Sequence, residues 1–387
     1  MPQSEPAIES LKAVVKPWYD SLSDPAGAQE NVLEKLLEDY SRTGYGKTHN
    51  ATPSLTIDEY RRRFKPIDYN SPKPIIDRVS KGDFQALLPE PTVAWVMTRG
   101  TTGVPKILPI TCKHLTQVLY CGARALANYV LRTRKFEILY DKVLNLNFPS
   151  RIGTIQSGNE LTTYGHSSGT YAKINPSFAG VDLVPRQEEI DALGGGLTKK
   201  DWEARFELTY KLTKGEDVRV CTGVAPVIVS FVRYVKRHHG KLPKEFWRIG
   251  GIFCTSVPKI HWKYAPILRY FYGDTPVIEM YKATEGVFAQ QLDDLPYVSP
   301  NYDAYFFEVI NGKRVKMLYE MKRGEWGRLL VSSCLFPRYD IGDMIECLGR
   351  NYFRVFGGSK KHRPSAHILP SFHPMVYLNF LEYALLR

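Results

Sequence analysis

Residues 93–109 read Val93-Ala-Trp-Val-Met-Thr-Arg-Gly-Thr-Thr-Gly-Val-Pro-Lys-Ile-Leu-Pro109, and the interpretation of the chain starts from this stretch. Its apolar beginning predicts a buried strand, and the segment from Thr98 to Gly103 predicts a turn. Glycine lets backbone N–H groups approach an anion, while the threonine hydroxyls and Lys106 add donors and a positive charge. The spacing is not that of G-x-x-x-x-G-K followed by Ser or Thr. Taken alone, the stretch fits a phosphate-binding loop and an ordinary Gly-Thr hairpin equally well.

The composition is that of a globular protein with an excess of basic residues. Of the 387 residues, 43% are hydrophobic and 24% are charged, and the formal net charge is +12. Such a balance favours anionic substrates, acidic membranes or nucleic acid. The basic residues are spread along the chain, with short clusters at Arg61–Arg63 and Lys236–His239. We therefore expect a generally basic surface and no specific nucleic-acid partner.

Cysteine usage and hydropathy indicate the cellular compartment of the protein. The six cysteines lie far apart, with no Cys-x-x-Cys pair and no Cys/His cluster at zinc spacing, as expected for reduced thiols. Residues 1–10 are polar and acidic and do not resemble a signal peptide. No apolar run approaches the ~20 residues that a spanning helix needs. We expect a cytoplasmic protein with no membrane partner.

Hydrophobic periodicity predicts helices at the start of the chain, strands alternating with helices in the middle and short strands near the end. The alternation predicts an α/β fold with a parallel sheet covered on both faces. Residues 150–168 are small and polar and predict a mobile loop that faces the substrate. Beyond residue 304, five short strands predict an antiparallel meander or barrel. The other predicted elements are helices at 7–43, 57–64, 113–132, 201–213, 226–238 and 259–271, and strands at 93–97, 137–148, 218–223, 250–254 and 276–281.

Polar residues follow several predicted strands of the middle region. They include Thr222-Gly223, Cys254-Thr255-Ser256 and Tyr281-Lys-Ala-Thr-Glu285. In sheets of parallel strands, ligands bind at the carboxyl ends. Together with the loop that begins at Thr98, these strand ends predict a nucleotide pocket.

Three segments, taken together, resemble the acyl-adenylate-forming superfamily, which includes acyl-CoA synthetases and luciferases. They are Thr98-Arg-Gly-Thr-Thr-Gly-Val-Pro-Lys106, Tyr281-Lys-Ala-Thr-Glu285 and Arg338-Tyr-Asp-Ile-Gly-Asp343, in that order. More closely, the chain resembles the Gretchen Hagen family of auxin-responsive acyl-acid amido synthetases. Asp58-Glu-Tyr-Arg61 and Pro66-Ile-Asp-Tyr69 resemble the opening of that family. The resemblance implies the large domain of an adenylate-forming enzyme, with mixed and parallel sheets flanked by helices and a barrel-like subdomain.

The resemblance also implies a reaction and its cofactors. A carboxylic acid would attack the α-phosphate of ATP to give an acyl-adenylate and pyrophosphate, and an amino acid amine or a thiol would then accept the acyl group. Mg²⁺, a hard cation, would bind Glu285. Thr284 would contact the α-phosphate, Tyr281 would lie against the adenine, and Asp343 would accept hydrogen bonds from the ribose. The remaining implied contacts are Thr98, Arg99, Gly100, Thr101, Thr102 and Lys106 for the phosphates, and Thr255 and Ser256 for the adenine and acyl pocket.

The implied acid-binding elements are the helix at 115–126, Phe148 and the segment 164–168. The chain departs from the family pattern at Arg99, where Ser or Thr is usual, and at Asp340, where arginine is usual. It also ends at Arg387, where relatives continue into a further mobile domain.

We therefore expect a helical part at 1–90, an adenylate-forming core at 91–356, and a hinge with a short tail at 357–387, the C-terminal small domain being largely absent. Alternatives to the amide-forming ligase are an acyl-CoA-type ligase and a non-catalytic nucleotide- or acyl-binding protein. A basic nucleic-acid-binding protein is a third possibility, resting on net charge alone.

Overall fold

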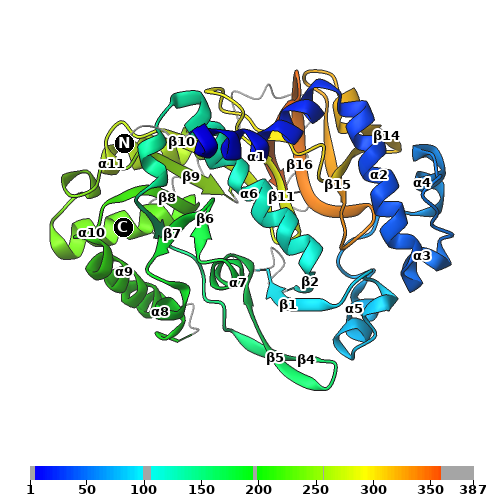
Figure 1. Ribbon diagram of the computed structural model, residues 1–387, viewed down its shortest axis with the longest axis horizontal. Coiled ribbons are helices and arrows are strands. Elements are labelled where there is room, and N and C mark those ends of the chain that lie inside the picture. Colours follow the sequence, from blue (N-terminus) through cyan, green and yellow to red (C-terminus); the bar gives the residue numbers. More distant parts are fainter. Residues whose placement is uncertain (1–4, 99–105, 195–197, 256, 359–387) are drawn as a thin grey trace.

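Three β-sheets and the helices that cover them form the computed structural model, which describes residues 5–98, 106–194, 198–255 and 257–358 (Figure 1). The largest sheet has eight strands in the order β12-β11-β10-β9-β8-β3-β7-β6, and β7, β3, β8, β9 and β10 run parallel. This sheet confirms the predicted α/β class. Its strands are β3 (Lys142–Asn145), β6 (Ser177–Phe178), β7 (Val181–Val184), β8 (Val218–Val224), β9 (Gly251–Thr255), β10 (Val277–Ala283), β11 (Gly286–Gln290) and β12 (Ser299–Pro300).

The helices between these strands agree with the predicted ones. α9 (Lys199–Thr213), α10 (Ala225–His239) and α11 (Ala265–Tyr272) follow the predicted spans closely, and α11 is preceded by one π-helical turn, η4 (Ile260–Tyr264). The long helix α6 (Cys112–Thr133) is capped by the Thr111 hydroxyl, which accepts a hydrogen bond from the His114 backbone N–H at 3.2 Å. The remaining short helices of this region are η2 (Phe136–Leu139), α7 (Ser167–Ile174), α8 (Gln187–Asp191) and η3 (Pro243–Glu245).

A second sheet contains the two strands on either side of the glycine-threonine segment. Its order is β2-β1-β5-β4, where β1 (Thr92–Met97) pairs antiparallel with β2 (Ile107–Thr111) on either side of the glycine-threonine segment. The loop predicted at 150–168 is wrong, because β4 (Gly153–Ser157) and β5 (Glu160–His166) form a hairpin there. Most hairpin residues are partly or fully exposed, so polar side chains suffice and no apolar alternation marks the strands.

The meander predicted beyond residue 304 is confirmed as an antiparallel five-stranded sheet in the order β14-β13-β15-β16-β17. Residues 300–311 join this sheet to the N-terminal helices. Gln29 of α2 donates hydrogen bonds to the carbonyl oxygens of Tyr302 and Tyr305, at 2.8 and 2.7 Å, and accepts one from the Phe307 N–H at 2.7 Å. The strands are β13 (Phe306–Asn311), β14 (Arg314–Met317), β15 (Trp326–Ser332), β16 (Tyr339–Gly349) and β17 (Tyr352–Gly358), with η5 (Leu318–Glu320) between β14 and β15.

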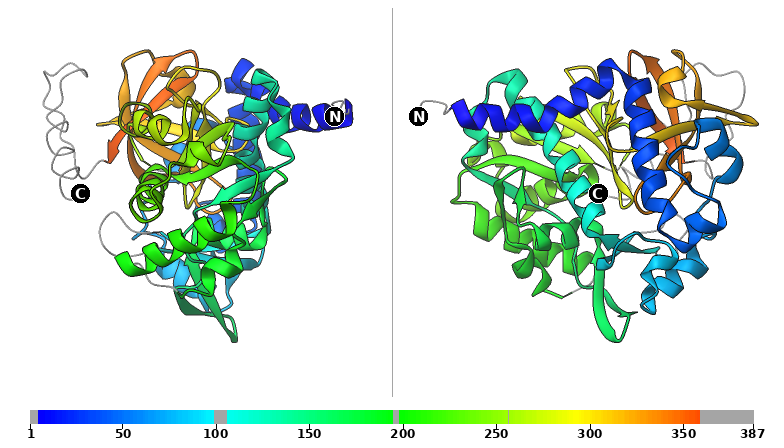
Figure 2. Two further views of the ribbon diagram at one scale, coloured as in Figure 1. Left: turned by 90° about the vertical axis from the view of Figure 1, so that its left-hand side faces the viewer. Right: turned by 45° about the vertical axis from the view of Figure 1, so that its right-hand side comes forward.

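The N-terminal helices run past α6 to the five-stranded sheet (Figure 2). The predicted single helical stretch at 7–43 is divided, because Asp24 caps a new helix and Pro25 occupies its first position. The helices are α1 (Glu5–Ser23), α2 (Pro25–Ser41), α3 (Gly44–Thr48), α4 (Ile57–Arg63) and α5 (Lys73–Ser80), followed by η1 (Phe84–Ala86).

Candidate functional site

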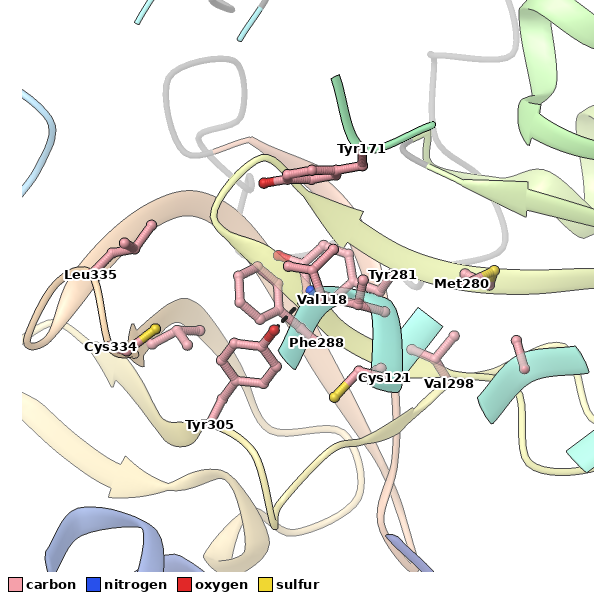
Figure 3. Packing of buried hydrophobic residues seen from close by; sticks show 14 of the residues in the cluster. Val118, Cys121, Tyr171, Met280, Tyr281, Phe288, Val298, Tyr305, Cys334 and Leu335 are labelled. Atoms are coloured by element: carbon pink, nitrogen blue, oxygen red, sulfur yellow. Dashed lines mark hydrogen bonds between the residues drawn. The ribbon is translucent and has the colours of Figure 1, made fainter. Parts of the chain in front are cut away.

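The sharp turn between β10 and β11 is the centre of the candidate site. Thr284 and Glu285 are its two residues, since Ala283 pairs with Gly286 across the hairpin. A side chain at Gly286 would meet the Tyr305 ring at 2.8 Å, so the close packing beneath the turn requires glycine. The Tyr305 hydroxyl also accepts a hydrogen bond from the Val287 N–H at 3.1 Å (Figure 3). The aromatic core thus fixes the position from which Glu285 projects.

Asp343 of β16 reaches the same end of the sheet. Its Oδ2 accepts a hydrogen bond from the Tyr281 hydroxyl at 2.8 Å, which joins the second and third family-like segments. The Tyr281 ring packs against Phe288 and Phe353, with ring centroids 5.5 and 6.0 Å apart. Figure 3 shows Tyr281 and Phe288 packed together beneath Tyr171. The Asp343 carboxylate is therefore held by a side chain that is itself locked in the core.

Lys106 lies at the other end of the glycine-threonine segment. Through Tyr339 it joins the cluster formed by Tyr281, Glu285 and Asp343. Its Nζ donates a hydrogen bond to the Tyr339 hydroxyl at 3.1 Å and lies 5.6 Å from the centre of that ring. The Glu285 carboxylate lies near the Tyr339 hydroxyl, and burial together with that carboxylate raises the Tyr339 pKa. The Tyr69 ring centre lies 5.5 Å from the Lys106 ammonium group. All three family-like segments therefore contribute to one cluster.

Electrostatic conditions in the cluster favour a cationic or hydrogen-donating ligand. Burial raises the pKa of Asp343 to about 6, and the negative charges of Glu285 and Asp340 add to this shift. The hydrogen bond from Tyr281 and the charge of Lys106 oppose it. Glu285 itself is 7% exposed. Two carboxylates are thus held near each other with Lys106 as a nearby cation, an arrangement that a metal ion or ligand hydroxyl groups would stabilise.

Two residues that sequence reasoning missed support Thr284 from behind. The Tyr171 hydroxyl of α7 donates to the Thr284 carbonyl oxygen at 3.4 Å and lies 3.1 Å from Nε2 of His114. Burial lowers the pKa of His114 to about 4, against the effect of its hydrogen bond to the Thr284 backbone, so the imidazole is neutral at pH 7. The Ser167 hydroxyl lies 3.3 Å from that of Thr284. Helices α6 and α7 therefore position the turn.

The other predicted site residues fall into two groups. Thr98 closes the base of the glycine-threonine segment by donating its N–H to the Lys106 carbonyl oxygen at 2.9 Å. Thr255 ends β9, is 8% exposed and donates to the Gly223 carbonyl oxygen at 3.5 Å. The predicted contacts that lie outside the described residues are Arg99, Gly100, Thr101, Thr102 and Ser256.

The elements predicted to face the acid differ in their distance from the turn. α7 begins at Ser167, directly beside Thr284, and His114 precedes the predicted 115–126 segment of α6. Phe148 is buried, and its ring centre lies 5.0 Å from those of His166 and Trp202. Phe148 therefore belongs to the packing behind α7.

Asp340, at the position of the usual arginine, is held in an ion pair. Its Oδ2 lies 2.6 Å from Nη1 of Arg328, and its Oδ1 accepts a hydrogen bond from the Gly342 N–H at 2.9 Å. Gly342 has a φ of +86°, which a side chain would disfavour. The Asp340 side chain thus shapes the turn that leads to Asp343.

The part of the chain that the structure describes contains neither a protein-only metal cluster nor a helix that could cross a membrane. No group of three or more His, Cys, Asp or Glu side chains there could hold a metal ion on protein ligands alone. None of the helices in these residues combines the length and the apolar character needed to cross a bilayer.

Comparison with known proteins gives one family match and several structural matches. The model of the GH3 family N-terminal domain matches residues 15–238. No curated protein sequence matches the chain. AtGH3.15 acyl acid amido synthetase, in complex with 2,4-DB, superposes with a TM-score of 0.72 at 13% identity, over 92% of this chain and 72% of that one.

Two further structures have the same fold at similarly low identity. GH3.15 acyl acid amido synthetase matches with a TM-score of 0.64 at 16% identity, over 88% of this chain and 69% of that one. An open conformation of 2-hydroxyisobutyryl-CoA ligase, in complex with 2-HIB-AMP and CoA, matches with a TM-score of 0.60 at 14% identity, over 89% and 77%. These similarities confirm the fold of the adenylate-forming large domain.

Proposed function

This chain belongs to the GH3 family, a family of ligases, and on that premise we propose that it activates a carboxylic acid with ATP as an acyl-adenylate, releasing pyrophosphate. One observation carries the proposal. Lys106, Glu285 and Asp343, which come from three distant segments, meet through Tyr339 and Tyr281 at the carboxyl end of the parallel sheet. That end is where open α/β sheets bind their ligands.

Each residue of the cluster has a role in this proposal. Lys106 neutralises charge on the phosphates, and the Thr284 hydroxyl donates a hydrogen bond to the α-phosphate at the point of attack. Asp343 accepts hydrogen bonds from the ribose hydroxyls, while Tyr281 lies against the adenine and holds Asp343 in place. Such a reaction depends on positioning and charge neutralisation and needs no protein nucleophile. Thr98 to Thr102 and Thr255-Ser256 complete the proposed nucleotide contacts.

Mg²⁺ fits the donor set at the turn. The ion usually takes one or two protein carboxylates and completes its shell with phosphate oxygens and water. Glu285 supplies such a carboxylate, and the Tyr339 hydroxyl lies close enough to support it. When bound, the ion would neutralise charge on the transferring phosphate groups.

For the second step we propose an amino acid amine as the acyl acceptor, on the basis of family membership. The alternative acceptor is a thiol such as CoA. A non-catalytic nucleotide-binding protein is the alternative to both. The three differ in what they do after ATP binds, so one assay series separates them.

The test is pyrophosphate–ATP exchange with Mg²⁺ and a panel of aryl, indolyl and short aliphatic acids. Exchange that depends on one class of acid is the expected result, and adding amino acids or CoA to the same mixture then identifies the acceptor. If calorimetry detects ATP binding but no acid of the panel supports exchange, adenylation by this chain is contradicted and the non-catalytic alternative is supported.

The raised pKa of Asp343 predicts the pH dependence of ATP use. Because ribose hydroxyls donate to the ionised carboxylate, kcat/KM for ATP should fall about tenfold per pH unit below pH 6. Saturating ATP should shift this limb to lower pH, since the bound ribose stabilises the charge. A profile of kcat/KM and kcat from pH 5 to 8 measures both effects.

Asp343 affects stability in the opposite direction to ATP use. Stability falls as pH rises, whereas kcat/KM for ATP rises. The folded-state pKa of Asp343, about 6, lies above the ordinary 3.8, so the fold disfavours the ionised form and stability decreases as pH rises between these values. Asp343→Asn should therefore melt at a higher temperature than the wild type at pH 7 while binding ATP more weakly. An unchanged acidic limb in this variant would assign the pH dependence to another group.

A further inference from the structure

Net positive charge is concentrated in one stretch of the sequence, although basic residues occur along the whole chain. Residues 233–272 contain nine Lys and Arg residues and one acidic residue, Glu245, which gives a net charge of +8 within a chain whose total is +12. This stretch includes the second half of α10, η3, β9, η4 and α11. α10 and α11 lie at the left-hand edge of the molecule in Figure 1. The exposed basic side chains are Lys236, Arg237, Lys241, Lys244, Arg248 and Arg269.

Contacts around Tyr270 show that basic residues from separate elements share one surface. Nζ of Lys236, on α10, lies 5.3 Å from the Tyr270 ring centre and donates to its hydroxyl at 3.3 Å. Nζ of Lys244, on η3, lies 5.5 Å from the same ring centre. Within the described residues no ion pair joins either lysine to a carboxylate. Tyr270 therefore holds two ammonium groups in place for an anion.

Large aromatic side chains are exposed on the same helical segment. Trp262 is 56% and Tyr270 is 53% exposed. Together with exposed Pro266 and Arg269 they recur at i, i+4, i+7 and i+8, which places them on one face of the helix formed by η4 and α11. The opposite face packs into the core through Leu268 and Phe271. The exposed rings of Trp262 and Tyr270 are therefore not part of the hydrophobic core.

This surface is separate from the proposed ATP site. The C-terminal ends of α10 and α11 lead back to β9 and β10, so Lys236, Lys244 and Tyr270 lie toward the amino ends of these strands. Thr284 and Glu285 follow the carboxyl end of β10. An occupant of the basic surface therefore does not compete for the nucleotide, and the inference does not depend on the proposed reaction.

We propose that this surface, defined by Lys236, Arg237, Lys244, Trp262, Arg269 and Tyr270, docks the protein on an anionic phospholipid surface. Lys and Arg supply charge complementarity to anionic headgroups, and exposed Trp and Tyr rings are the side chains that settle at the level of the headgroups. Single-stranded nucleic acid needs open ring faces for stacking. Two ammonium groups already lie near the Tyr270 ring, so one of the two exposed rings is less open to stacking, which favours lipid headgroups. The attachment is peripheral, and it differs from the expectation of no membrane partner, which considered only membrane-spanning segments.

The experiment is cosedimentation of the whole chain with vesicles of phosphatidylcholine alone or with about one third phosphatidylserine. Binding to the anionic vesicles only, weakening as salt rises, is expected. Each lysine near such a surface contributes about a factor of five, so Lys236→Ala with Lys244→Ala should bind roughly thirtyfold more weakly. The charge-matched control is Lys313→Ala with Lys322→Ala, two exposed lysines on the five-stranded-sheet side, for which binding should stay within about twofold.

Intrinsic fluorescence supplies a second measurement that does not depend on removing charge. A blue shift on adding anionic vesicles should be present in the wild type and absent in Trp262→Phe, whose melting temperature should match the wild type because the ring is exposed. Equal partition to neutral vesicles, or equal weakening by both lysine pairs, would overturn the proposal. So would binding to a single-stranded oligonucleotide without binding to vesicles, because that result assigns the surface to nucleic acid.

Discussion

Replacing Glu285 by glutamine should lower the rate of acid-dependent pyrophosphate–ATP exchange by at least about a hundredfold. The amide has the same shape as the carboxylate, so the turn between β10 and β11 should keep its form. What is lost is the negative charge that the proposed Mg²⁺ contact requires. The measurement is exchange rate against Mg²⁺ concentration, and the half-saturating concentration should rise.

A matched control removes a different carboxylate. Glu346 lies on β16, as Asp343 does, but pairs with Arg354 at 2.6 Å, and within the described residues its side chain forms no hydrogen bond or ion pair with the cluster. Glu346→Gln should exchange within about twofold of the wild type, because it removes only a partly exposed ion pair. If Glu285→Gln instead kept wild-type exchange and wild-type Mg²⁺ dependence, Glu285 would have no part in the reaction.

Local hydrophobic pattern and family resemblance together predicted residues of the candidate site, but not how they contact one another. Glu285 and Thr284 follow an apolar strand, and such a strand end is recognisable from hydrophobic periodicity alone. Asp343 could be placed near them only through the resemblance, since nothing local connects it to Tyr281, which is 62 positions away. The hydrogen bond between Tyr281 and Asp343 was therefore beyond prediction even though both residues were named.

The residues that were missed share one property, which is that their partners are distant in the sequence. Tyr339 contacts Lys106 across 233 positions, and Tyr171 contacts Thr284 across 113. Tyr69 and Tyr339 lie inside segments that resemble the family. The presence of a tyrosine in such a segment does not predict which side chain its hydroxyl will contact. His114 sits at the start of an amphipathic helix, where a buried position is the ordinary expectation. Its contact with the turn follows from the packing of α6 and α7, which periodicity does not specify.

The third family-like segment also contains a residue whose role is structural. Arg338 is 3% exposed and forms an ion pair with Glu308, which is 1% exposed, through contacts of 2.7 and 3.2 Å. Arg338 also donates to the carbonyl oxygens of Phe64 and Arg61, at 2.8 and 3.2 Å. It thus joins the end of α4 to the five-stranded sheet. Its side chain therefore serves the fold, even though it belongs to the segment that carries Asp343.

Replacing Arg338 by methionine should lower the free energy of unfolding by about 3 kcal/mol, at the lower end of the range for a broken buried ion pair. Methionine fills much of the volume, but among the described residues Glu308 then keeps Arg61 as its one charged partner, at 2.8 Å, and the Phe64 carbonyl oxygen loses its side-chain donor. Urea titration followed by circular dichroism measures the loss. The control Arg78→Met breaks an exposed pair with Asp83 and should cost at most about 1 kcal/mol.

The effect of Arg338 should reach the proposed nucleotide-binding cluster through the backbone. The Arg338 carbonyl oxygen accepts a hydrogen bond from the Ile67 N–H at 3.1 Å, and the Asp340 N–H donates to the Ile67 carbonyl oxygen at 2.7 Å. These bonds hold Tyr69 and Tyr339 near the Lys106 ammonium group, which lies 5.5 and 5.6 Å from their ring centres. Arg338→Met should therefore weaken ATP binding, whereas joint replacement of Arg338 by Met and Glu308 by Leu should recover much of the stability, because no carboxylate is then left buried. If the single variant were as stable as the wild type, the buried pair would contribute nothing to the fold, and the presence of arginine in this segment would need a direct role at the nucleotide.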